Sequence, residues 1–353
     1  MLPVYAAAVE GTQVLNSSAN QWDSAQLFRP WVIYDGSSFT MWYAGEDSQG
    51  TDRLGMATSN DGVSWTKYSG NPVLDLGTPG SWDGDSISDA CVLKENAGYK
   101  MWYTGQTYGA SSADDVFKIG YATSPDGIHW TKYSGNPVLT PGSLGSWDDR
   151  RVWRPSVIPT GSGYVMYYRG AAIAEGSQAK AGVATSSDGI HWTKTTVLTM
   201  PAGSSGWDAY SRQVEALNIG DVMKSGDTYI MSYASIKTQT SPAQIGVASS
   251  QDGINWTPYS DNPVITYGTS GGWDSGSGGV GAGNFAGSMI LAAQNQYYVY
   301  YAASGPSGSY SIGLATLSMS TYQIPEYPTS PLVLMIAILA PLALLSIRPR
   351  RKP

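Results

Sequence analysis

The chain has 353 residues, with 42 glycines, 24 tyrosines, 13 tryptophans and only 13% charged residues, a composition typical of short strands joined by tight turns. Four of its 20 basic residues lie in the last six positions, which leaves 16 basic against 27 acidic residues in the rest of the chain. Such an acidic chain has no basic stripe for nucleic acid. The single cysteine, Cys91, excludes a disulfide within the chain, so stability must come from a large packed core.

Four near-identical segments recur along the chain, and each contains an Asp-Gly pair with a tryptophan three residues after the glycine. These tryptophans are 65, 62 and 64 residues apart, at Trp65, Trp130, Trp192 and Trp256. A period this regular predicts stacked copies of one structural unit.

Five Trp-Asp pairs mark the starts of the copies. They are Trp22-Asp23, Trp82-Asp83, Trp147-Asp148, Trp207-Asp208 and Trp273-Asp274. Each pair is followed by an apolar strand, a strand with paired aromatic residues, and a strand related to G-x-A-T-S. An Asp-Gly turn, a strong hairpin signal, then leads to a last short strand. We therefore predict an all-β, five-bladed β-propeller with four-stranded antiparallel blades.

The fifth copy stops after G-L-A-T-L at residues 313–317 and lacks its last strand. Residues 12–23 match the segment that runs from N-P-V-L to the Trp-Asp pair in the other copies. We expect this N-terminal strand to pair with the fifth copy and close the ring, because closure leaves no unpaired edge. The propeller would then occupy residues 10–322 as one domain.

Both ends of the chain carry targeting features. Residues 1–9 resemble the end of a signal peptide, or else form a disordered start. Residues 323–331 form a proline-rich spacer, and residues 332–348 are apolar enough for a short transmembrane helix. The basic residues 349–353 predict a cytoplasmic tail and an extracellular, surface-anchored propeller. Spacer, span and basic end resemble the sorting tails of archaeal and some bacterial surface proteins; the alternative is an ordinary anchor.

The repeated aspartates are interpreted as structural, because a residue that recurs in nearly every copy serves the fold first. His129 and His191 follow Asp-Gly turns, where the other copies have Ser64 and Asn255. We expect both histidines on an outer turn. Neither is a candidate for catalysis or for metal binding.

Residues that break the repeat near the first strand of a copy are expected to converge on the central axis, where a propeller has its channel. They are Arg29 and Trp31 in the first copy, Asp85 and Asp89 in the second, Asp149, Arg150, Arg151, Trp153 and Arg154 in the third, and Arg212, Glu215 and Asp221 in the fourth.

Arginines are concentrated in these segments. Five of the seven that lie outside the C-terminal tail occur here: Arg29, Arg150, Arg151, Arg154 and Arg212. Guanidinium groups gathered at one mouth indicate either ion pairs with Asp149 and Glu215 or a site for an anionic group. The repeat-equivalent Arg29-Pro30 and Arg154-Pro155 favour a structural role for that pair.

Carboxylates from three successive copies suggest glycoside chemistry. Cleavage of a glycosidic bond needs one carboxyl group as acid and another as base or nucleophile. Asp89, Asp149 and Glu215 would supply such a set, and tryptophan and tyrosine in the channel wall would stack on sugar rings. The alternative for each carboxylate is a partner for a nearby arginine.

The segments R-P-S-V-I, Y-V-M-Y-Y-R-G and G-V-A-T-S-S-D-G-I-H-W-T-K resemble the five-bladed propeller superfamily of glycoside hydrolase families 43, 32, 68 and 130. The resemblance covers residues 10–322 and implies an Asp before the first inner strand, an Asp in the next blade and a Glu acid. Asp89 matches the second, and Glu215 is similar to the third with a longer insert. Arg29 stands where the first Asp would be, which departs from the family-43 pattern. The resemblance would permit an axial calcium, but no histidine is placed to coordinate it, so no cofactor or metal is expected.

The sequence therefore predicts an extracellular propeller that hydrolyses glycosidic bonds, with Asp89 and Glu215 as the acid/base pair and Asp149 in support. Its partners would be carbohydrate and, through the anchor, the membrane, and we expect a monomer. One alternative is a non-catalytic surface module that binds glycans or protein. Another, by resemblance to family 130, is a phosphorylase with phosphate held by Arg150, Arg154 and Arg212. Substrate binding is assigned to Arg29, Trp31, Asp85, Arg150, Trp153, Arg154 and Arg212.

Overall fold

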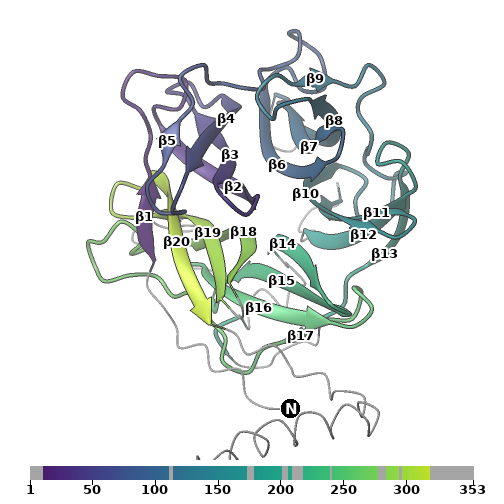
Figure 1. Cartoon of the computed structure of the whole chain (residues 1–353). Helices are drawn as coiled ribbons and strands as arrows, with labels where there is room; N and C mark the ends of the chain where they lie inside the picture. The colour runs from purple at the N-terminus through teal and green to yellow at the C-terminus, as the bar shows by residue number, and fades with distance from the viewer. Residues whose placement is uncertain are drawn as a thin grey trace, which may run out of the picture. The chain divides into compact units, whose positions relative to one another are not determined.

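The computed structural model describes residues 11–110, 114–172, 179–200, 206–208, 218–238, 241–276, 284–293 and 296–318. These residues form twenty strands and no helix, which confirms the all-β prediction (Figure 1). All of them belong to one compact unit, Val4–Met319.

The strands form antiparallel sets of four that follow the sequence repeat. The first copy is β2 (Gln26–Tyr34), β3 (Phe39–Glu46), β4 (Asp52–Ser59) and β5 (Thr66–Lys67), paired in that order. The fourth copy is β14 (Asn218–Ser225), β15 (Thr228–Ser235), β16 (Gln244–Ser250) and β17 (Thr257–Pro258).

The second and third copies share one eight-stranded sheet. The second copy is β6 (Ser86–Glu95), β7 (Gly98–Thr107), β8 (Val116–Ser124) and β9 (Thr131–Lys132). The third copy is β10 (Arg151–Thr160), β11 (Gly163–Ala171), β12 (Lys180–Ser186) and β13 (Thr193–Val197). The two sets meet at a parallel pairing of Arg151 with Phe117.

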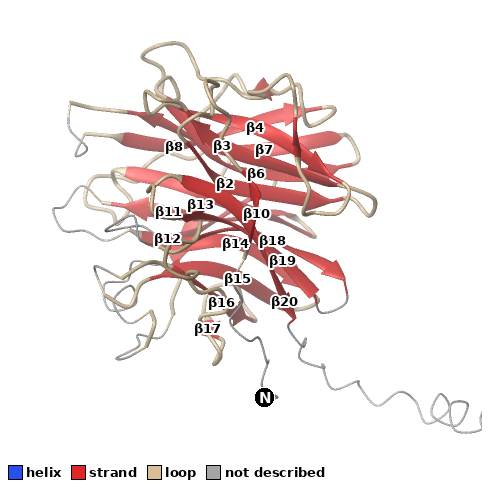
Figure 2. Ribbon diagram, turned by 90° about the vertical axis from the view of Figure 1, so that its left-hand side faces the viewer, coloured by secondary structure: helices blue, strands red, loops and turns tan. Residues whose placement is uncertain are grey.

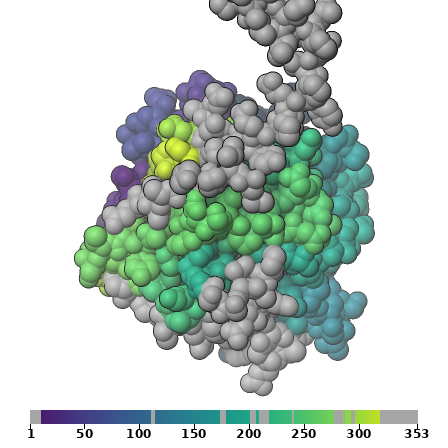
Figure 3. All heavy atoms as spheres, turned by 90° about the horizontal axis from the view of Figure 1, so that it is seen from below, coloured from purple at the N-terminus to yellow at the C-terminus, as the bar shows by residue number. Residues whose placement is uncertain are grey.

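The N-terminal strand completes the fifth copy. This sheet has the order β1 (Thr12–Leu15), β20 (Tyr310–Ser318), β19 (Gln296–Ser304), β18 (Asn284–Ala293). Thr12 pairs with Leu314 and Gln13 with Gly313, which confirms the expected pairing of the first strand with the last copy. In the space-filling view of Figure 3, the purple N-terminal and yellow C-terminal parts of the described chain lie on the same side.

The first strands of the five copies surround the centre. β2 contacts β6, β6 contacts β10, β10 contacts β14, β14 contacts β18, and β18 contacts β2. Figure 1 shows these strands nearest the middle, and Figure 2 shows the strands crossing the molecule with loops at their ends. Hydrophobic clusters fill the spaces between neighbouring copies; one joins Trp42 and Leu54 of the first copy to Ile87 and Met101 of the second.

The Trp-Asp aspartates are buried and tie strands together, which supports their structural interpretation. Asp83 is 3% exposed and accepts hydrogen bonds from Lys132 Nζ (2.7 Å) and the Tyr103 hydroxyl (3.1 Å). The same lysine and tyrosine contacts recur at Asp23, with Lys67 and Tyr43, and at Asp148, with Lys194 and Tyr168.

The Asp-Gly turns of the first three copies bond to the copy that precedes them around the ring. In the second copy, Asp126 accepts the backbone N–H groups of Ile128 and His129, both at 2.9 Å. The Gly127 carbonyl of this turn accepts the indole N–H of Trp42 from the first copy, at 2.9 Å. Equivalent bonds run from Trp102 to Gly189 and from Tyr300 to Gly62, so the last copy is also joined to the first.

The predicted segments 1–9, 323–331, 332–348 and 349–353 lie outside the described residues. Within the described ranges, no helix is long and apolar enough to cross a membrane.

Candidate functional site

The first strand of every copy is interrupted by a β-bulge. The pairing registers shift between Phe28 and Trp31, Ser88 and Cys91, Trp153 and Ser156, Ile219 and Val222, and Ala286 and Met289. Each bulge sets two residues opposite one on the partner strand and bends the strand locally. Because these strands surround the centre, the bulges meet around a common hollow.

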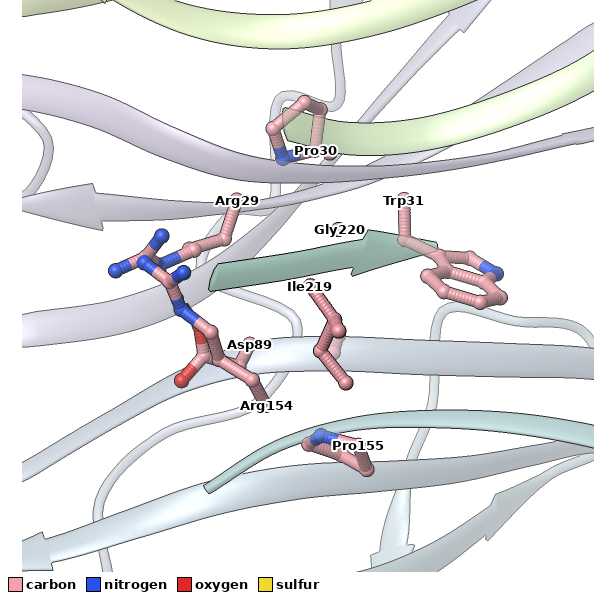
Figure 4. A pocket seen from close by; sticks show the side chains of 10 residues that line it. Arg29, Pro30, Trp31, Asp89, Arg154, Pro155, Ile219 and Gly220 are labelled. Atoms are coloured by element: carbon pink, nitrogen blue, oxygen red, sulfur yellow. Dashed lines mark ion pairs between the residues drawn. The ribbon is translucent and has the colours of Figure 1, made fainter. Parts of the chain in front are cut away.

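Bulge residues form most of the wall of this hollow. The lining residues are Arg29, Pro30, Trp31, Asp89, Ala90, Arg154, Pro155, Ile219, Gly220 and Gly287 (Figure 4). Its volume is about 30 Å³. That is room for one or two groups of the size of a water molecule, whereas sites for whole small molecules measure about 300–1,000 Å³. A sugar would therefore lie at the mouth and send only a small substituent into the hollow.

Three of the bulge residues have a backbone conformation that is rare for side-chain-bearing residues. The φ angles are 54° at Arg29, 51° at Asp89 and 56° at Arg154. In the described part of the chain, Asn20 is the only other non-glycine residue with positive φ. Such a conformation costs about 1–2 kcal/mol per residue, and strain of this kind concentrates at functional sites.

One carboxylate oxygen of Asp89 faces two guanidinium groups. Its Oδ1 is 2.8 Å from Arg29 Nε and 3.7 Å from Arg154 Nε, and Figure 4 shows both guanidiniums beside its carboxylate. The side chains of Asp89 and Arg154 are only 7% and 8% exposed. Ser88 Oγ donates to the other carboxylate oxygen at 3.3 Å, and Thr104 Oγ1 accepts the Arg154 backbone N–H. The side chains are thus held in place before any ligand arrives.

A third arginine, Arg169 on β11, does not line the hollow but interacts electrostatically with Arg29 and Asp89, and it was not predicted from the sequence. Its guanidinium lies 5.0 Å from the centre of the Trp153 ring, and its Nη1 donates to Asn218 Oδ1 at 3.4 Å. Burial and the charge of Arg29 lower the pKa of Arg169 to about 10, while Asp89 acts in the opposite direction. The sequence did hold a signal, since the same place in the other aromatic strands is Ala44, Thr104, Ala234 or Ala302.

Aromatic rings accompany the arginines. The Phe117 ring meets the Trp153 ring edge-on at 6.1 Å, and the Arg151 guanidinium lies 4.6 Å from the Phe117 ring centre. Arg29 lies 5.8 Å from the ring centre of Phe28. Flat apolar faces beside guanidinium groups suit ligands that combine a ring with polar groups.

Of the other predicted site residues in the described ranges, Asp85, Asp149, Arg150 and Trp153 do not line the hollow. Asp85 accepts the Tyr108 N–H at 2.8 Å, Asp149 accepts the Gly145 N–H at 2.7 Å, and the Arg150 backbone N–H donates to the Ala171 carbonyl at 3.1 Å. Trp31 does line it, with its indole N–H bonded to the Val92 carbonyl. Glu215 and Arg212 lie outside the described residues.

A second buried carboxyl group, also missed from the sequence, lies near Asp89. Asp52 on β4 is 6% exposed, and its Oδ1 has no hydrogen-bond partner among the described residues. Burial raises its pKa well above the usual value, and the charges of Glu46 and Asp89 act in the same direction. Glu46 lies directly across the β3–β4 pairing and accepts a bond from Gln26. Burial and the two neighbouring charges therefore favour the protonated form of Asp52.

The fourth bulge carries Asp221, which is fully enclosed. Its Oδ1 accepts from Ser156 Oγ at 3.0 Å, and its Oδ2 accepts from the Met289 N–H at 3.1 Å. These bonds join β10, β14 and β18. Burial raises the pKa of Asp221 to about 7, against the lowering effect of the bonds.

The residues around the hollow do not fit calcium. Across the described ranges, no group of three or more His, Cys, Asp or Glu side chains is placed to hold a metal ion. The carboxylate that faces the hollow, Asp89, has guanidinium neighbours that would repel a cation.

No protein-family model matches the chain. An uncharacterised protein from Mycobacterium tuberculosis is 31% identical over 154 residues, covering 42% of this chain and 48% of that protein. A 1,2-β-oligomannan phosphorylase from Thermoanaerobacter is 29% identical over 126 residues, 34% of this chain and 40% of the enzyme. A blood-group-A N-acetyl-α-D-galactosamine deacetylase from Flavonifractor plautii is 27% identical, over 38% of this chain and 18% of that protein. The chain thus spans about half the length, or less, of the curated relatives it matches.

Solved structures match over nearly the whole chain. A glycosyl hydrolase from Bacteroides ovatus has a TM-score of 0.63 at 18% identity, over 88% of this chain and 97% of that one. A thermostable family-43 glycoside hydrolase has a TM-score of 0.61 at 15% identity, over 88% and 98%. Identities this low show the fold alone. The chain is therefore an all-β protein whose sheets resemble those of propeller glycoside hydrolases.

Proposed function

We propose that the chain is a carbohydrate-active five-bladed propeller that cleaves a glycosidic bond, with Asp89 as the carboxylate at its centre. One observation carries this proposal: Asp89 is 7% exposed, on strained backbone, and held by Arg29 and Arg154 in the hollow where the bulges meet. A carboxylate that is buried and held in place by its partners is better suited to catalysis than a carboxylate in a solvent-exposed ion pair. Carbohydrate as the substrate class is supported by the phosphorylase and deacetylase relatives and by the hydrolase folds.

The five-bladed interpretation is supported by the four-stranded copies. The eight-stranded sheet divides naturally into two blades, because its halves meet at the pairing of Arg151 with Phe117. The cyclic contacts of the five first strands and the bond from Tyr300 to Gly62 support closure of the ring.

Hydrolysis requires a second carboxyl group opposite Asp89. Glu215 stays our proposed partner, since it precedes the fourth bulge strand in the sequence. Asp52 is a further candidate, because burial raises its pKa and a catalytic acid is a carboxyl group whose pKa is raised. Asp149 is less suited, because it does not face the hollow.

Phosphorolysis is a second candidate, favoured by the surplus of guanidinium groups around one carboxylate. In that reaction inorganic phosphate attacks the anomeric carbon while a carboxyl group protonates the leaving oxygen, so one carboxyl group suffices. The oligomannan phosphorylase relative supports it. A non-catalytic glycan-binding module is the third candidate.

The test compares wild type with Asp89→Asn on a panel of neutral and acidic oligosaccharides, with and without phosphate. Hydrolysis predicts sugar release without phosphate, with a loss of about a hundredfold or more in the variant. A sugar phosphate formed only with phosphate present indicates phosphorolysis. If the wild-type protein binds a glycan without cleaving it, an enzymatic function is contradicted and the non-catalytic glycan-binding module is supported.

An extracellular location with a membrane anchor at residues 332–348 is also proposed, on the apolar segment and basic end of the sequence. Membrane fractionation of the full chain and of a chain ending at residue 322 tests it. Equal solubility of the two would contradict the anchor, and gel filtration of the shorter chain tests the expected monomer.

A further inference from the structure

We infer that Arg154 and Arg169 form a subsite for the carboxylate of an acidic sugar, so that the glycan this protein takes is anionic. The inference deepens the proposed carbohydrate function and rests on it for the nature of the ligand. Its test is a binding measurement that requires no cleavage.

The charge balance of the site points to an anion. Three guanidiniums, those of Arg29, Arg154 and Arg169, act on one carboxylate, that of Asp89. The Nε of Arg29 lies 2.8 Å from Asp89 Oδ1, and the Nε of Arg154 lies farther from the same oxygen, at 3.7 Å. Among the described residues that line the hollow, the two guanidiniums of Arg29 and Arg154 face the single carboxylate of Asp89, in a protein whose formal net charge is −7.

The two arginines also have buried hydrogen-bonding capacity that the described residues leave unused. The Nε atoms of Arg154 and Arg169 are buried and have no hydrogen-bond partner in the described part of the chain. Burying a charged donor without an acceptor is costly, and a ligand oxygen would recover that cost. Arg169 makes one long bond, 3.4 Å to Asn218, and so remains available for a better acceptor.

The size and the walls of the site favour a carboxylate attached to a ring. The hollow of about 30 Å³ takes a planar carboxylate more easily than the larger tetrahedral phosphate. Trp153 does not line the hollow, but it directly precedes the lining residue Arg154. Arg169 lies against the Trp153 ring and Phe117 meets that ring edge-on, which gives apolar faces on which a sugar ring can stack. Guanidinium forks match the planar carboxylate geometry.

Titration calorimetry with the full chain would compare methyl glucuronide and methyl galacturonide with the matching neutral glucoside and galactoside. Inorganic phosphate would serve as an anion without a sugar ring. We expect an acidic glycoside to bind at least about tenfold more tightly than its neutral counterpart, because bonds to charged groups are roughly twice as strong as neutral ones. Arg154→Met and Arg169→Met should each abolish this preference, and Arg169→Lys should retain part of it.

Arg53→Met is the matched control, because Arg53, which lies on β4, pairs with Asp47 and Asp75 and does not line the hollow. It should leave the preference unchanged. Equal binding of acidic and neutral glycosides, a preference that survives both methionine variants, or binding of phosphate without the uronides would overturn the inference. Because Arg154 is buried, circular dichroism must show a folded variant; if it does not, Arg169→Met and Arg169→Lys decide the matter.

The outcome separates this inference from the proposed function. Uronide binding that depends on Arg169 without any sugar release would support the subsite and contradict the enzyme. Release of sugar from neutral glycans without a preference for uronides would support the enzyme and contradict the subsite.

Discussion

The Nε of Arg29 lies 2.8 Å from Oδ1 of Asp89, although the two residues are on the first strands of different copies. Both occupy the first position of a bulge, with φ angles of 54° and 51°. This ion pair links neighbouring copies at the centre and fixes the carboxylate that we place at the active site.

Removal of the Arg29 charge should destabilise the fold. Arg29→Met leaves the buried Asp89 with Arg154 at 3.7 Å, and we expect a loss of about 1–3 kcal/mol, below the figure for fully buried pairs because Arg29 is 26% exposed. Urea unfolding measures it. Arg53→Met breaks contacts with Asp47 and Asp75, which are 14% and 69% exposed against 7% for Asp89, and should lose no more than about 1 kcal/mol. Equal losses would show that the central pair has no special role.

The Trp-Asp aspartates should matter for stability and not selectively for activity. Asp83→Ala removes the carboxylate that Lys132 and the Tyr103 hydroxyl bond to, and the free energy of unfolding should fall by about 3 kcal/mol. His129→Ala, whose side chain is 77% exposed, should change it by less than about 0.5 kcal/mol. If Asp83→Ala folded with wild-type stability and lost ligand binding, the structural assignment would be wrong.

Two glycines with nearly the same backbone angle test the contact between copies. Gly189 has φ +82° and a Cβ there would lie 2.9 Å from Trp102, while Gly80 has φ +83° and open space. Alanine at either site carries a shared strain of about 1–2 kcal/mol. Gly189→Ala should cost about 1–3 kcal/mol more, from overpacking against the indole. Similar melting curves for the two variants would mean that the turn does not fit tightly against its neighbour.

Asp221 should give the protein a pH-dependent stability. Its pKa of about 7 in the fold exceeds the ordinary 3.8, so the folded state binds the extra proton between these values. The contribution is fully present below pH ~4 and falls as pH rises, by up to about 1.4 kcal/mol per unit, until it is lost above pH ~7. In Asp221→Asn the amide oxygen can accept the Met289 N–H and its NH₂ can donate to Ser156, so the variant should fold without this slope.

Urea unfolding of both proteins from pH 4 to 8 measures the difference, because the other titrating groups are common to the two. The stability of wild type relative to the variant should decline across this range. Parallel curves would contradict the raised pKa.

Most of the fold could be predicted from the repeats, because turns and buried aromatic residues recur at regular positions in the sequence. Even the pairing of β1 with β20 followed from one recurring segment. The β-bulges of the first strands could not be predicted from such a pattern. Asp89 faces the hollow because a bulge turns it inward, whereas Asp149, which precedes its strand, bonds to a loop amide.

Arg169 shows what the sequence reading overlooked. The predicted site residues precede or lie on the first strands, whereas Arg169 lies on the second strand of its copy, directly after the repeated pair of aromatic residues. Its contact with Trp153 follows from the pairing of β10 with β11 within one copy, whereas its interaction with Asp89 depends on packing between copies, which a linear pattern does not encode.

The central claim is that Asp89 performs chemistry on a glycan. The most direct test is kcat/KM for wild type, Asp89→Asn and the exposed control Asp75→Asn on whichever glycan of the panel wild type cleaves fastest. The account predicts a loss of about a hundredfold or more for Asp89→Asn, with Asp75→Asn close to wild type. An Asp89→Asn enzyme as active as the Asp75→Asn control would contradict it.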